Sequence, residues 1–96
     1  MTEKSPHYLG HRNRLRERFL KAPENIADYE LLELILFSAS PRSDTKPLAK
    51  ALLSDLKSLS AVLLSPPEKL ARTPGVGPAA IAAFGTIKEA MSRILR

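Results

Sequence analysis

The sequence contains no cysteine and no tryptophan, and only five of its 96 residues are aromatic. The absence of cysteine excludes disulfides, thiolate metal sites and cysteine nucleophiles. With so few aromatic side chains, the core must be built mostly from Leu, Ile, Val and Ala. No apolar run reaches the roughly 18 residues that cross a bilayer, and residues 1–6 lack the apolar segment of a signal peptide. We therefore expect a cytoplasmic, bacterial-type protein with no membrane partner.

What the chain does contain is typical of one small globular domain, with 44% apolar residues and a net charge of +5. The charge is distributed unevenly. Residues 1–21 carry a net charge of +4, residues 22–41 carry −4, and residues 42–96 carry +5. Two basic segments around an acidic one suggest contact with a polyanion at both ends. Ordinary solvated helix faces explain the same layout equally well.

The first predicted helix covers about residues 6–21, where Tyr8, Leu15 and Phe19 share one apolar stripe. Four arginines flank that stripe on both sides. They could grip phosphates, or their stems could cover the edge of the core while their charged ends pair with the acidic second helix. We favour the second use. The arginines are Arg12, Arg14, Arg16 and Arg18.

The second predicted helix covers about residues 29–38, with Asp28 as its N-cap. Its segment 31–37 is almost entirely apolar, which predicts a central, buried element. The segment is rich in Leu and lacks Val and Thr, so a helix is favoured over a strand. Glu30 and Glu33 lie one turn apart with no base or nucleophile beside them. We interpret them as part of a solvated face.

Three further helices follow at short intervals. Asp44 or Ser43 is expected to cap the third, which places Leu48, Leu52 and Leu56 on one buried face. Residues 58–64 form a short apolar connector, and residues 65–68 match a capping box that starts the fifth helix. With the final helix described next, the sequence predicts an all-α, compact six-helix bundle.

The most informative segment is 70–83, where one helix is expected to end at Thr73 and the next to begin at Pro78. Proline costs nothing there, because the first N–H of a helix has no intrahelical partner. Gly75 and Gly77 allow the backbone a positive φ and a close approach to another surface. This pattern is typical of a helix-hairpin-helix motif.

Such a hairpin offers a binding site for anions. Val76 is expected to fill the space between its two helices, while backbone amides near Gly77 and Ala79 point outward at a positive helix end. Donors placed in this way hold a phosphate backbone without identifying bases. Hairpins of this kind often hold a monovalent cation on their carbonyl groups, and we expect no other cofactor.

The hairpin is preceded, in order, by GHRNRLRERFL at 10–20, DYELLELIL at 28–36, PRSDTKPLA at 41–49 and SPPEKL at 65–70. This series resembles the N-terminal domain of RadC-type bacterial proteins over about residues 7–95. The resemblance implies a helical domain that precedes a JAB/MPN metalloprotease-like domain, in a family named for DNA repair. The zinc signature of that second domain, two histidines separated by one residue and followed by Ser and Asp, is absent here. We therefore expect a non-enzymatic chain, either an excised N-terminal domain or a short relative.

The two histidines, His7 and His11, lie four residues apart with no acid placed to complete a metal site. We interpret them as solvent-side residues and expect no metal and no catalytic residue.

The arrangement of helices also suggests two subregions of one domain. Residues 1–24 form a basic N-terminal helix on the core, and residues 25–96 form a tandem helix-hairpin-helix-like unit whose first hairpin, at 38–44, is degenerate because it lacks the glycines.

Two functions remain open. The first is a non-specific, backbone-directed DNA-binding accessory domain of a DNA-repair-associated protein. The second is a protein-interaction or structural module that uses the Ala79, Ala80 and Ala83 side of the last helix to contact a JAB/MPN domain or a repair protein. The sequence departs from the usual pattern of DNA-binding hairpins, which commonly place Lys or Arg just after the second glycine. No Lys or Arg directly follows Gly77, and this weakens the first function. The expected DNA-binding residues are Lys69, Arg72, Gly75, Val76, Gly77 and Ala79 at the second hairpin, with Arg42 and Lys46 at the first.

Overall fold

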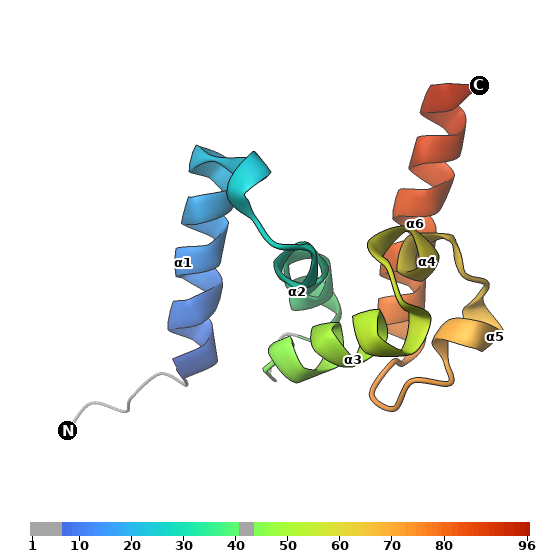
Figure 1. Ribbon diagram of the computed structural model, residues 1–96, viewed down its shortest axis with the longest axis horizontal. Helices are drawn as coiled ribbons and strands as arrows, with labels where there is room; N and C mark the ends of the chain where they lie inside the picture. The colour runs from blue at the N-terminus through green and yellow to red at the C-terminus, as the bar shows by residue number, and fades with distance from the viewer. Residues whose placement is uncertain (1–6, 41–43) are drawn as a thin grey trace.

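The computed structural model describes residues 7–40 and 44–96, with side chains from Gly10 onward, and this part of the chain is helical without any strand. The prediction of six α-helices is confirmed, and a short 3₁₀ turn is added between the first two (Figure 1). No helix in the described part is long and apolar enough to cross a membrane. The elements are α1 (His7–Lys21), η1 (Pro23–Asn25), α2 (Asp28–Ala39), α3 (Lys46–Leu56), α4 (Leu59–Leu64), α5 (Pro67–Leu70) and α6 (Pro78–Leu95).

Helix α2 lies at the centre of the molecule, as its apolar sequence predicts. Figure 1 shows it between α1 on one side and α3, α4 and α6 on the other. Its Leu32 and Leu36 are fully buried and belong to the main core together with Leu52 of α3, Val62 of α4 and Phe84 of α6. A helix that is apolar on nearly all sides is stable only when neighbours surround it.

Helix α1 packs on α2 through a second, smaller core. Leu15 is 1% exposed and meets Ile26 and Phe37, with Phe19 half-buried beside them. The predicted apolar stripe is therefore confirmed at Leu15 and Phe19, while the side chain of Tyr8 lies outside the described residues.

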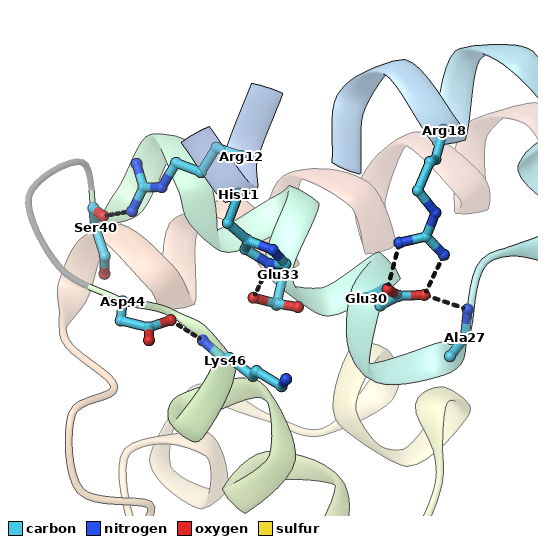
Figure 2. A network of polar contacts seen from close by, with 9 residues as sticks. All are labelled: His11, Arg12, Arg18, Ala27, Glu30, Glu33, Ser40, Asp44 and Lys46. Atoms are coloured by element: carbon cyan, nitrogen blue, oxygen red, sulfur yellow. Dashed lines mark hydrogen bonds and ion pairs between the residues drawn. The ribbon is translucent and has the colours of Figure 1, made fainter. Parts of the chain in front are cut away.

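Polar contacts add to this attachment, and they correct two predictions (Figure 2). Arg18 donates to the Glu30 carboxylate at 2.9 Å, and His11 pairs with Glu33 at 3.1 Å between Nε2 and Oε1. Glu30 and Glu33 are buried, so their interpretation as a solvated face is wrong, as is that of His11 as a solvent-side residue. The reason is that α2 is covered on the side that carries both acids, and α1 supplies their partners from far away in the sequence. The use of arginine to pair with the acidic helix is confirmed at Arg18.

The N-terminus of α2 begins one residue earlier than predicted. Ala27, not Asp28, is the N-cap residue. The backbone N–H of Ala27 donates to Glu30 Oε1 at 3.0 Å, so the acid in the first turn satisfies the helix end.

The caps of α3 and α5 differ in a similar way from the sequence pattern. Asp44 Oδ1 accepts from the Lys46 amide at 3.0 Å, which confirms Asp44 as the acceptor at the start of α3, although Thr45 holds the N-cap position. The capping box predicted at Ser65 is wrong, because the Ser65 hydroxyl donates instead to the Ala61 carbonyl of α4. Pro66 is the N-cap of α5, without a side-chain hydrogen bond.

Candidate functional site

The candidate site is the turn between α5 and α6. Helix α5 ends at Leu70, three residues before the predicted end at Thr73. Residues after Leu70 form i→i+3 bonds, from Arg72 N–H to Lys69 O and from Thr73 N–H to Leu70 O, both 3.2 Å. Because the residue before a proline disfavours the α conformation, Thr73 before Pro74 cannot extend the helix.

Only one of the two glycines in this turn uses a conformation that favours glycine. Gly75 has φ +96°, and a Cβ there would lie 3.3 Å from Leu48 Cδ1 of α3. Gly77 has φ −103° as the N-cap of α6, and a Cβ there would meet nothing within 4 Å. The expectation of positive φ is thus confirmed at Gly75 and wrong at Gly77, since the N-cap position of a helix is extended. Val76 between them is half-buried and packs against the main core.

Helix α6 presents free backbone donors at this turn. Pro78 is its first residue, and no described residue accepts a hydrogen bond from the N–H of Gly77 or Ala79. Gly77 is half-buried and Ala79 is exposed. Two unpaired donors at the positive end of an 18-residue helix form a local centre of positive potential.

Lys69 and Arg72 supply full positive charges next to the turn. Both are exposed, and both line an open pocket together with Thr73. The Thr73 hydroxyl donates to Asp55 Oδ2 of α3 at 2.8 Å, which ties the start of the turn to α3. The sequence alone does not reveal this pair, since Asp55 lies 18 residues before Thr73.

The residues predicted at the first hairpin are not brought into this pocket. Arg42 lies outside the described residues, as do its neighbours at 41 and 43 of the hairpin predicted at 38–44. Lys46 stands at the opposite end of α3 from the pocket, roughly 16 Å away along an 11-residue helix. Its Nζ lies 5.9 Å from the centre of the Tyr29 ring, and Lys50 Nζ lies 5.0 Å from that ring. Lys46 therefore belongs to a separate cluster with Tyr29 and Lys50.

The described residues contain no group of three or more side chains that could hold a metal ion. A monovalent cation on the carbonyl groups of the turn, which hairpins of this kind often hold, stays an untested option.

Comparison with known proteins finds several relatives, among them a bacterial protein of substantial identity that matches nearly the whole chain. The UPF0758 protein of Ruegeria pomeroyi is 44% identical to this chain over 93 residues. The match covers 95% of this chain and 42% of the relative, so the chain spans less than half of the relative's length. Because UPF0758 is the RadC family, this similarity supports a RadC-like assignment. No family model matches the chain, and no solved structure matches it.

Proposed function

We propose that this chain is a non-specific DNA-binding accessory domain of a RadC-like, DNA-repair-associated protein. The observation that carries the proposal is the α5–α6 turn, where free N–H groups of Gly77 and Ala79 lie at a helix N-terminus next to Lys69 and Arg72. Oriented backbone donors and positively charged side chains are the two kinds of group that hold phosphate.

The binding is directed at the backbone and not at the bases. The donors at the turn are main-chain amides, which carry no sequence information, and no long side chain extends beside them from Pro78 or Ala79. The cations precede the turn instead of following it, so fewer charges lie over the amides than in a hairpin with Lys or Arg after its second glycine. Few phosphate contacts imply weak binding, which we expect in the micromolar range typical of non-specific complexes.

The test is a pair of isosteric substitutions at Gly77, Gly77→Asp and Gly77→Asn. Both residues are good N-caps in the extended conformation that Gly77 adopts, so both variants are expected to fold. Only aspartate places a negative charge over the amides. Fluorescence anisotropy with a labelled duplex at low salt is expected to show loss of binding of about tenfold or more for Gly77→Asp and a much smaller loss for Gly77→Asn. Equal affinities for the two variants would contradict a phosphate site at this turn.

A second function, a protein-interaction module, is favoured by a different surface. The face predicted for a protein partner, the Ala79, Ala80 and Ala83 side of α6, is not available as a whole. Ala80 is only 3% exposed and belongs to the core. An apolar pocket of about 220 Å³ lies instead where α1, α2 and α4 meet. It is lined by Phe19, Leu31, Leu34, Ile35, Leu59 and Leu63.

The two functions are separated by a titration of the isotope-labelled chain with the part of the Ruegeria protein outside the matched 93 residues. Chemical-shift changes around Leu34 and Leu63, with no DNA binding at low salt, would favour the interaction module. Changes confined to Gly77 and Ala79 on addition of DNA would favour the nucleic-acid function.

A further inference from the structure

We infer that Lys57, Lys69 and Arg72 form a second phosphate-binding site for the nucleic-acid backbone, beside the amides of the α5–α6 turn. This inference rests on the proposed function and adds a site that includes Lys57, a residue that the sequence pattern did not single out.

The three cations come from two elements that are distant in sequence. Lys57 is the C-cap residue of α3, while Lys69 lies in α5 and Arg72 directly after it. All three line one open pocket of about 410 Å³. Within the described part of the chain, none of the three forms an ion pair with a carboxylate. Three cations with no acidic partner around one hollow favour an anion as its occupant.

The acid in the pocket does not cancel these charges. Asp55 is the only carboxylate among the lining residues that the structure describes, and its Oδ2 accepts the hydrogen bond from Thr73. The hydroxyl of Thr73 is neutral and leaves the charge of Asp55 in place, so one negative charge stands against three positive charges. The pocket is therefore net positive.

The backbone of Lys57 gives an independent reason to assign it a role. Its φ is +86°, and it is the one non-glycine residue with positive φ in the described chain. Its N–H donates to Leu53 O at 2.8 Å, the bond that closes α3. Glycine takes this helix-ending conformation at less cost than any residue with a side chain. A lysine there is less favourable for folding, and what it adds is a cation at the pocket.

The pocket and the amides lie at the two ends of one turn. Thr73, which lines the pocket, precedes Pro74, and Gly77 and Ala79 follow it. A nucleic-acid strand carries a phosphate at every nucleotide, so a single strand can occupy both sites. The cations at the end of α3 and in and after α5 then replace the Lys or Arg side chain that is missing directly after Gly77.

The test uses three substitutions at Lys57 and a labelled DNA duplex. Lys57→Gly is expected to raise the melting temperature, because it relieves the positive φ, and to weaken DNA binding about three- to tenfold. Lys57→Gln is expected to weaken binding equally, and Lys57→Arg to keep the wild-type affinity. The slope of log K against log salt, measured between about 50 and 200 mM, should fall by about 0.9 for the glycine and glutamine variants.

Lys21→Gln is the matched control. It removes the same charge from an exposed residue at the end of α1 and should change the affinity by less than about twofold. A stabilised Lys57→Gly variant that binds DNA as the wild type does, while Gly77→Asp abolishes binding, would overturn the second site and leave the proposed function intact. If Lys57→Gly and Lys57→Gln lose DNA binding while Gly77→Asp keeps it, the pocket site is supported and the amide site is overturned. A wild-type chain that does not bind at low salt would overturn both.

Discussion

At the scale of single residues, Glu30 of α2 shows how the fold sets the charge of a group. The pKa of Glu30 is lowered, first by the hydrogen bond from Arg18 and further by the one from the Ala27 amide, while desolvation by burial acts in the opposite direction. The same hydrogen bond raises the pKa of Arg18. Glu30 is thus held as a carboxylate by two donors, one from another helix and one from its own N-cap.

This shift predicts a pH-dependent contribution to stability. A carboxyl group with a lowered pKa stabilises the fold above the ordinary value of 4.5, and that contribution is lost as the pH falls through the lower folded-state pKa. Glu30→Gln should therefore lower the urea midpoint at pH 7, and the difference from the wild type should narrow below about pH 4.5. Urea unfolding of both proteins across this range is the measurement. A difference that is constant with pH would contradict the ion pair as its source.

The two glycines of the α5–α6 turn should respond differently to alanine. At Gly75 the positive φ and the contact with Leu48 predict that Gly75→Ala lowers the free energy of unfolding by about 1–2 kcal/mol. At Gly77, where the backbone is extended and the space is open, Gly77→Ala adds no strain and should cost less, about 0.5–1 kcal/mol, because alanine is a poorer N-cap than glycine. Chemical denaturation measures the free energy of unfolding of both variants. Equal losses at Gly75 and Gly77 would show that the turn constrains both positions.

At the scale of secondary-structure elements, α1 and the other helices rest on different cores. Helix α1 contacts α2 and η1, and its buried Leu15 belongs to the smaller cluster with Ile26 and Phe37. Leu52 of α3 is buried in the main core. An element attached through one small apolar cluster and a few polar contacts can open without the rest of the fold.

Leu15→Ala and Leu52→Ala test this division. Each removes a fully buried leucine side chain. If the fold unfolded as one unit, each should lower the free energy of unfolding by about 2–4 kcal/mol. We expect Leu15→Ala to accelerate amide hydrogen exchange in α1 while α2 and α6 keep their protection. Leu52→Ala should accelerate exchange in all of these helices. Uniform loss of protection in Leu15→Ala would mean that α1 and the main core unfold together.

At the scale of the whole molecule, the basic groups do not gather on one helix. In Figure 1, α1 lies at one side of α2, and the turn before α6 lies at the other. Several of the α1 arginines contact α2 or the residue that follows it, although only Arg12 is buried. Arg12 is buried and donates to the carbonyl groups of Phe37 and Ser40, and Arg16 lies over the Phe37 ring. Arg12 and Arg18 thus contribute to the attachment of α1, whereas the cations of the proposed DNA interface lie at the end of α3 and in and after α5.

This distribution predicts binding that ignores base sequence. The proposed interface consists of backbone amides and cations, which contact phosphates and carry no sequence information. We therefore expect duplexes of equal length and scrambled sequence to bind with affinities within about twofold of one another. Competition anisotropy with several unlabelled duplexes measures this directly. A tenfold preference for one sequence would indicate base contacts that the proposed interface does not contain.

The helices could be predicted from the sequence because their signals are local. The apolar run from Leu31 to Phe37 predicted the central helix, and Pro78 after Gly77 predicted the start of α6, since both depend on neighbouring residues. The family resemblance, carried by the order of such local blocks, is supported by the Ruegeria relative.

The partners of polar groups were decided only by the tertiary structure. His11 and Glu33 meet across 22 residues, and Thr73 and Asp55 across 18, so no spacing in the sequence reveals either pair. The same is true of Lys57, which joins Lys69 and Arg72 only because α3 ends beside α5. Backbone preferences act over a few residues, whereas the burial of a charge and the identity of its neighbour depend on how separate helices pack.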